Sequence, residues 1–123
     1  MVKLVFCLRR LTRLSRPEFQ RYWRETHGPL VARHAELLRI RRYVQTHALD
    51  TPQNDALRAS RGTTEPYDGF AELWWDHFDD LGAALATPEG RAASQALYED
   101  EQRFIDLARS SLVLCEEHPI VTR

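Results

Sequence analysis

Alternating apolar residues predict β-strands in four segments of the chain, at residues 2–9, 40–49, 69–75 and 111–117. In the first, third and fourth of these segments both faces are largely apolar, as in a strand that is covered on two sides. The second segment is more polar, and its alternation places three polar side chains on one face: Tyr43, Gln45 and His47. The pattern therefore predicts a sheet with apolar surface on both sides.

Two stretches between these strands have a helical period. Ser15-Arg16-Pro17-Glu18 predicts a helix start, because Ser15 can cap free backbone N–H groups and Glu18 can complete a capping box. Apolar residues then recur in steps of three and four along one stripe: Phe19, Tyr22, Trp23, Thr26, Leu30, Val31, Leu37 and Leu38. Thr87-Pro88 predicts the start of a second helix, whose acidic run Glu99-Asp100-Glu101 is expected on the solvated face.

Residues 51–67 are rich in Thr, Asn, Asp, Gly and Pro and predict a long loop. A loop of that length is usually either a functional lid or a locally disordered segment, and both alternatives stay open here.

The order strand, helix, strand, strand, helix, strand predicts an α+β fold of the ferredoxin-like βαββαβ type. In this fold a four-stranded antiparallel sheet carries its helices on one face. The other face is also apolar and needs a cover, for which a second copy of the chain is the simplest source. We therefore expect a homodimer, in which two sheets pack together as a dimeric α+β barrel.

The length of 123 residues favours one domain over residues 1–123. Lys and Arg number 17 against 18 for Asp and Glu, so the charge indicates no nucleic-acid partner. No apolar run reaches the ~18 residues of a membrane helix, and MVKLVFCLRR is charged too early for a signal peptide. Cys7 and Cys115 are expected to be reduced thiols, which is consistent with a cytoplasmic protein.

The stretch RYWRETHGPLVARH places His27 at a Gly28-Pro29 pair. On a helix His27 lies beside Trp23 and Leu30 on the apolar stripe, so its imidazole is expected to face the sheet. The Gly-Pro pair is expected to break the helix and to free a backbone carbonyl that holds one ring nitrogen. His27 is then either a buried structural residue or a proton shuttle with a pKa near neutrality.

Other candidate ligand contacts are the aromatic and polar residues near that stripe or on the strands: Tyr22, Trp23, Leu30, His34, Tyr43, His47 and Trp74. Tyr22, Trp23 and Trp74 have a structural alternative in the core. Tyr43 and His47 have one at a polar dimer interface. Glu72 is either an interface charge or a pocket carboxylate, and Asp76 is a helix cap rather than an acid. The His and Cys spacing predicts no metal site, and the chain has no glycine-rich phosphate loop, so no cofactor is expected.

The opening MVKLVFCLRR and the stretch LSRPEFQRYWRETHGPLV resemble the EthD family of dimeric α+β barrel proteins. In that family an aromatic pair precedes His-Gly-Pro-Leu. The similarity is sharpest from Val2 to Val31, and the order of elements extends it over nearly the whole chain. The resemblance implies a small hydrophobic pocket between helices and sheet, and decarboxylation, dehydration, isomerisation or oxygenation as the activities of family members and distant relatives.

The function expected from these observations is a small cofactor-independent enzyme that transfers protons on an apolar, oxygenated ring compound. Such a compound is a polyketide-derived aromatic or a lactone, and the reaction is a dehydration, decarboxylation, isomerisation or cyclisation. His27 is the expected catalytic acid and base. The alternatives are a non-catalytic ligand-binding or accessory protein of an oxygenase system and, third, a cofactor-free monooxygenase.

Overall fold

Four antiparallel strands form one sheet in the computed structural model, which describes all residues from 1 to 123. The strands are β1 (Val2–Leu8), β2 (Arg42–His47), β3 (Gly69–Trp75) and β4 (Ser111–Cys115), in the order β2-β3-β1-β4 across the sheet. The register places Phe6 of β1 opposite Ala71 of β3 and Leu112 of β4. This is the predicted ferredoxin-like α+β fold.

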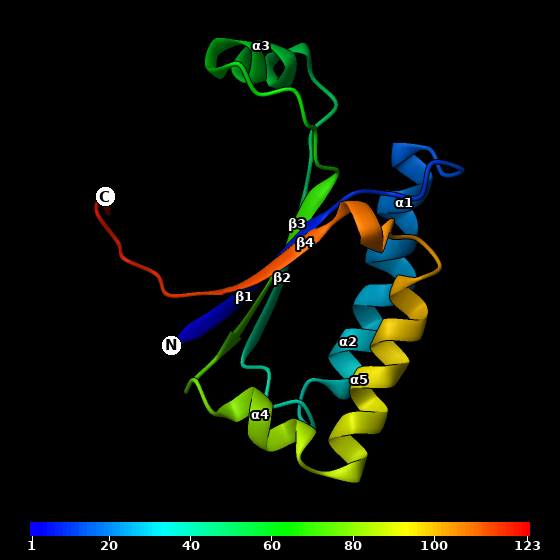
Figure 1. The fold of residues 1–123 in the computed structure, drawn as a ribbon, viewed down its shortest axis with the longest axis vertical. Helices are drawn as coiled ribbons and strands as arrows, with labels where there is room; N and C mark the ends of the chain where they lie inside the picture. The colour runs from blue at the N-terminus through cyan, green and yellow to red at the C-terminus, as the bar shows by residue number, and fades with distance from the viewer.

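Most of the helices lie on one side of this sheet (Figure 1). A continuous helical arm consists of α1 (Arg16–Tyr22), a π-helical turn η1 (Trp23–His27) and α2 (Gly28–His34), and α5 (Pro88–Glu101) lies beside it. The short helix α4 (Asp80–Leu85) closes the end of the space between sheet and helices, and the 3₁₀ turn η2 (Leu107–Arg109) leads into β4. None of the helices is both long and apolar enough to cross a membrane.

Both predicted helix starts are confirmed by side-chain caps. The Ser15 hydroxyl accepts a hydrogen bond from the Glu18 N–H at 3.2 Å, and the Glu18 carboxylate accepts one from the Ser15 N–H at 3.0 Å. At the start of α5, the Thr87 hydroxyl accepts a hydrogen bond from the Gly90 N–H at 3.0 Å. These bonds satisfy backbone N–H groups that have no partner inside the helix.

The prediction of a loop over residues 51–67 is wrong, because helix α3 (Pro52–Arg61) lies within it. Thr51 caps its start and Gly62 ends it with a φ of 69°. No residue of α3 is buried, and the helix stands away from the sheet (Figure 1). The helix contains one large apolar residue, Leu57, and its other residues are small or polar. The Thr-Pro start and the glycine stop were signals of a helix that the prediction of a loop missed.

The core lies between the sheet and the helical arm, in two clusters. One cluster contains Phe19, Trp23 and Phe104, packed on Phe6 and Leu8 of β1. A second cluster joins the other end of the arm to α5: Val31, Leu38, Ala93 and Leu97. The aromatic rings form a chain, with centroids 5.5 Å apart between Phe19 and Trp23 and between Phe19 and Phe104.

The helix-free face of the sheet is partly apolar and open. Phe70 and Val113 keep 36% and 52% of their surface exposed there. Trp74 also lies on this face, between the cations of Lys3 and Arg42, and its indole N–H donates to Glu117 at 2.6 Å. The expectation of apolar residues on both faces of the sheet is therefore met.

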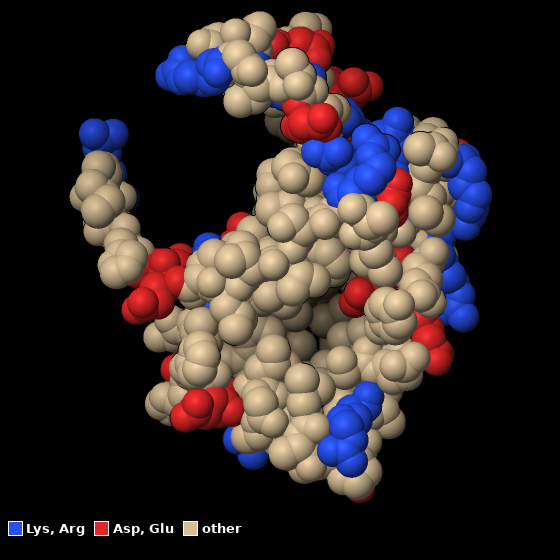
Figure 2. Space-filling model, in the orientation of Figure 1, with Lys and Arg blue, Asp and Glu red and all other residues tan.

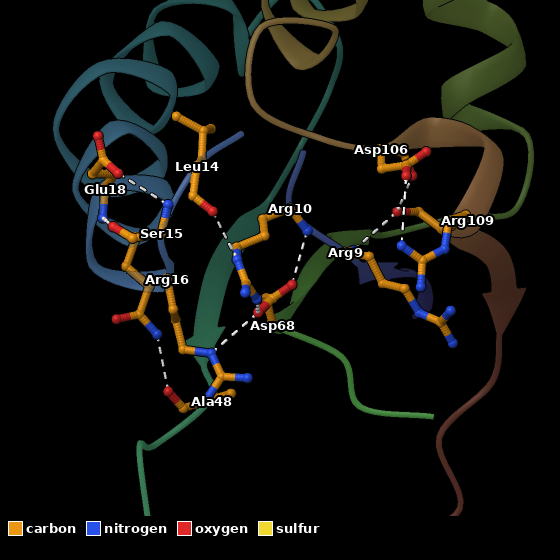
Figure 3. A network of polar contacts seen from close by, with 12 residues as sticks. Arg9, Arg10, Leu14, Ser15, Arg16, Glu18, Ala48, Asp68, Asp106 and Arg109 are labelled. Carbon is orange, nitrogen blue, oxygen red and sulfur yellow. Dashed lines mark hydrogen bonds and ion pairs between the residues drawn. The ribbon is translucent and has the colours of Figure 1, made fainter. Parts of the chain in front are cut away.

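A buried carboxylate, Asp68, ties the start of α1 to the edge of the sheet (Figure 3). It accepts hydrogen bonds from the Arg10 backbone N–H and guanidinium at 2.8 and 2.7 Å, and from Arg16 at 3.1 Å. We call Arg10, Arg16 and Asp68 the loop aspartate cluster.

Candidate functional site

A cavity of about 410 Å³ lies between the sheet and the helices. Most of its lining residues are hydrophobic, and they come from the inner face of the sheet, from the helical arm, and from α4 and α5. The space-filling view has a hollow among uncharged surface atoms, with an acidic side chain at its edge (Figure 2). This volume and this character suit a small apolar ligand.

The π-turn η1 places His27 at this cavity. Pro29 has no N–H, and the Gly28 N–H bonds to the Trp23 carbonyl five residues earlier, which widens the helix by one residue. The same carbonyl accepts a hydrogen bond from the Gln45 side chain on β2 at 2.9 Å. The predicted break at Gly28-Pro29 is therefore a wide turn, and the arm continues as helix on both sides of it.

The imidazole of His27 is held by a carboxylate rather than by the backbone carbonyl that the sequence predicted. Its Nδ1 lies 2.7 Å from Oδ2 of Asp100, near the end of α5. The other oxygen of Asp100 accepts hydrogen bonds from the Tyr22 hydroxyl at 2.5 Å and from Arg103 at 3.0 Å. His27 and Asp100 are 5% and 3% exposed. We call Tyr22, His27, Asp100 and Arg103 the cavity aspartate cluster.

The cluster keeps Asp100 charged and His27 neutral. Burial by itself raises the pKa of Asp100, but the hydrogen bonds from Tyr22, His27 and Arg103 outweigh it and hold the pKa below its ordinary value. Burial lowers the pKa of His27, and the bond to Asp100 opposes this only in part. A neutral His27 with an ionised Asp100 has its proton on Nδ1. Its Nε2 has no hydrogen-bond partner in the protein, and the ring lines the cavity.

Glu101, the residue after Asp100, lines the cavity as well. Burial, and after it the charge of Asp100, raises the pKa of Glu101 to about 7. The expectation that the acidic run is solvated holds for Glu99, which is exposed, and is wrong for Asp100 and Glu101. A helical projection of α5 contains the signal that was missed, since Ser94, Leu97, Tyr98 and Glu101 share one face and all line the cavity.

The structure brings some of the candidate ligand contacts to the cavity and places others elsewhere. Trp23 and Tyr43 line it together with His27. The Tyr43 hydroxyl accepts a hydrogen bond from Gln45 at 2.9 Å, and burial raises its pKa. The remaining candidates are not on the cavity wall: Tyr22, Leu30, His34, His47 and Trp74.

Each of these five residues is placed elsewhere by its packing. Tyr22 lies behind His27, on Asp100, and Trp74 lies on the helix-free face of the sheet. His47 stacks on Trp23 with ring centroids 4.3 Å apart and bonds to Gln45. Leu30 packs against the second core cluster, and His34 is half-buried at the end of α2. Helical and strand periods place a side chain on a face, but the cavity covers only part of each face.

No three His, Cys, Asp or Glu side chains lie close enough together to hold a metal ion. The polar chemistry at the cavity is that of one imidazole, one carboxyl group, two phenols and neutral polar side chains. The chain therefore represents a class of protein with a ferredoxin-like α+β fold and an apolar pocket between helices and sheet, where a histidine on the pocket wall is held by a buried aspartate behind it.

The chain belongs to the EthD domain family, whose sequence model matches residues 11–108. Among solved structures it is similar to an EthD family protein of Bacillus halodurans, with a TM-score of 0.64 and 21% identity over 96% of this chain and 99% of the other. No curated protein sequence matches it.

Two further solved structures share the fold. One is a dimeric protein of ferredoxin-like fold from Bacteroides fragilis, with a TM-score of 0.58 and 15% identity over 94% of this chain and 95% of the other. The second is SnoaB, a cofactor-independent oxygenase of Streptomyces nogalater, with a TM-score of 0.51 and 17% identity over 94% and 91%.

Proposed function

We propose that this protein is a cofactor-independent enzyme that moves a proton on an apolar, oxygenated ring compound such as a polyketide-derived aromatic or a lactone. The observation that carries the proposal is the imidazole of His27, held at 2.7 Å by a buried carboxylate on the wall of an apolar cavity. The reaction is a dehydration, isomerisation or cyclisation, in which one proton is removed and one returned, or a decarboxylation, in which a proton is delivered to the carbon that loses CO₂.

His27 is the proposed base. Asp100 accepts the Nδ1 proton and thereby keeps the Nε2 lone pair available to a substrate in the cavity. The proton that Nε2 removes makes an imidazolium ion, which the adjacent carboxylate stabilises until the proton is returned at another atom. The apolar walls supply orientation, because a general base alone contributes roughly 10²–10⁴-fold in rate.

The proposal has a direct test that does not need the natural substrate. We expect the protein to accelerate the exchange of the acidic ring protons of 2-tetralone, a bicyclic ketone, for deuterium in D₂O, as followed by proton NMR. His27→Ala is expected to reduce the exchange by roughly 10²-fold or more while the ketone still binds. Exchange that proceeds as fast in His27→Ala as in the original protein contradicts the proposal.

Two other functions remain as alternatives. An accessory or ligand-binding protein of an oxygenase system binds the ring compound without exchange, so the same experiment separates it from an enzyme. A cofactor-free monooxygenase is suggested by the similarity of fold to SnoaB. It differs from a proton-transfer enzyme in consuming oxygen, so turnover that occurs only in air favours it.

We also propose that the protein works as a homodimer joined through the helix-free face of the sheet. Its support is the apolar surface of that face and the dimeric state of the ferredoxin-like relative from Bacteroides fragilis. Light scattering is expected to give twice the chain mass of 14.4 kDa, and Val113→Arg is expected to give one chain mass. A monomeric original protein contradicts this.

A further inference from the structure

The cavity contains a second titratable group that the proposed mechanism does not use. Glu101 is the only carboxylate among the lining residues, and no Lys or Arg side chain reaches the wall. Its carboxyl group has no hydrogen bond and no ion pair within the protein, although it is partly buried. Every other buried carboxylate of the chain, Asp68 and Asp100, has several such partners.

The groups around Glu101 favour its neutral form. Asp100 is the adjacent residue on α5 and carries a negative charge, and Tyr98 of the same helix also lines the cavity. From the elements packed against α5, His27 of η1 and Tyr43 of β2 face the same cavity, and burial, with a smaller contribution from the charge of Glu101, raises the pKa of Tyr43. None of these neighbours carries a positive charge that stabilises a carboxylate. With a pKa of about 7, Glu101 is a neutral acid in about half of the molecules at pH 7, and it lines the same cavity as the neutral base His27.

We infer that Glu101 is the acid partner of His27, and that the ligand of the cavity is an apolar ring compound with a carbonyl oxygen that accepts the Glu101 hydrogen. The inference rests on the proposed function and extends it, since it adds a catalytic residue and restricts the class of substrate. Asp100 connects the two groups, since it is hydrogen-bonded to His27 and precedes Glu101 in the chain.

The step that the two groups perform is an enolisation. His27 Nε2 takes the proton from the carbon next to the carbonyl group, and the C–H electron pair becomes a C=C bond. The π electrons of the carbonyl group move to its oxygen, which takes the proton of Glu101. The products are an enol, an imidazolium ion and a carboxylate, and the reverse transfer at the same or another carbon restores both groups. No oxidant or further reactant is needed.

Binding of two probes tests the role of Glu101 independently of turnover. 2-Tetralone and tetralin share a skeleton and differ in the carbonyl oxygen, and Trp23 and Trp75 on the cavity wall report binding by their fluorescence. We expect the ketone to bind roughly 3- to 10-fold more tightly than the hydrocarbon at pH 6, because it gains a hydrogen bond. This preference is expected to fall as the pH rises from 6 to 8.5, since Glu101 then loses its proton.

Glu101→Gln is the critical variant, because it keeps the volume of the side chain and removes its titration. We expect a preference for the ketone that no longer changes with pH, together with deuterium exchange reduced by at least about tenfold. Glu99→Gln is the matched control on the exposed side of the same helix and is expected to behave as the original protein.

The possible results separate the two proposals. Two results overturn the inference. One is a preference for the ketone that changes with pH to the same extent in Glu101→Gln and in the original protein, and the other is no preference for the ketone in the original protein. Exchange that depends on His27 but not on Glu101 overturns the inference and leaves the proposed function intact. A preference that depends on Glu101, with exchange that ignores His27, overturns the proposed function and leaves Glu101 as the group that recognises the ligand.

Discussion

Two buried aspartates of this protein have nearly the same exposure and different surroundings. Asp68, in the loop aspartate cluster, is 4% exposed and Asp100, in the cavity aspartate cluster, is 3% exposed. Asp68 is held by Arg10 and Arg16, both permanently charged, and it joins a loop to the edge of the sheet. Asp100 is held by Tyr22, His27 and Arg103, and its histidine lines a cavity.

The difference lies in the partners rather than in the burial of the two carboxylates. A guanidinium group keeps its proton at any physiological pH, so the loop aspartate cluster can only stabilise structure. An imidazole gives and takes a proton near neutrality, and a carboxylate on one ring nitrogen leaves the other free to do so. The cavity aspartate cluster therefore has a chemical use that the loop aspartate cluster lacks.

The largest effect is expected from removing the carboxylate of the loop aspartate cluster. Asp68→Ala leaves two arginines without their buried partner and is expected to lower the free energy of unfolding by about 2–4 kcal/mol. Urea unfolding followed by fluorescence measures this. Deuterium exchange of 2-tetralone, measured well below the unfolding transition, is expected to stay within twofold. If a folded Asp68→Ala protein loses most of its exchange activity, the claim that only the cavity aspartate cluster takes part in the chemistry is wrong.

The next effect concerns the carboxylate of the cavity aspartate cluster. Asp100→Asn keeps the shape of the residue but no longer favours the His27 tautomer with its proton on Nδ1. We expect the exchange to fall roughly 10- to 100-fold, and the fall reports positioning rather than direct contact with the substrate. Its pH profile is expected to change shape, whereas the matched Asp68→Asn protein keeps the original profile. Equal profiles for the two variants contradict the assignment of Asp100.

A smaller effect on stability is expected at Glu101. Its pKa is raised from 4.5 to about 7 in the folded protein, so the stability that its neutral form contributes is fully present below pH 4.5 and is lost as the pH rises through 7. Glu101→Gln removes this loss and is expected to be more stable than the original protein by roughly 1–2 kcal/mol at pH 8, with little difference at pH 4.5. Denaturation at both pH values measures it. A difference that does not change with pH contradicts the burial of a neutral carboxyl group.

The smallest effect is expected from the exposed cation of the cavity aspartate cluster. Arg103 is 63% exposed at its side chain, and Asp100 keeps its bonds from Tyr22 and His27 without it. Arg103→Gln is therefore expected to lower the free energy of unfolding only slightly. Arg16→Gln, in the loop aspartate cluster, is the matched comparison and is expected to cost more, because Arg16 is only 27% exposed. If Arg103→Gln lowers the free energy of unfolding more than Arg16→Gln does, the exposure of the arginine side chain does not decide its contribution to stability.

The sequence by itself determined the features that depend on neighbours in the chain. Alternation predicted the strands, and the caps at Ser15 and Thr87 predicted helix starts that the structure confirms. The apolar stripe placed His27 on the inner side of its helix, where the structure has it buried. For α3 these local signals were present but were missed, because the Thr51-Pro52 start and the Gly62 stop lie in a strongly polar stretch that was interpreted as a loop.

Only the tertiary structure determined which side chain the imidazole of His27 contacts. Its partner comes from α5, 73 residues away in the chain, and no spacing within either helix relates the two. The π-turn that widens the helix in place of the predicted break also depends on Gln45 of β2, which bonds to the Trp23 carbonyl. Hydrophobic periodicity and helix-capping residues reflect how each segment folds locally against an apolar surface. The positions of charges that face each other across a cavity follow from how the segments pack together.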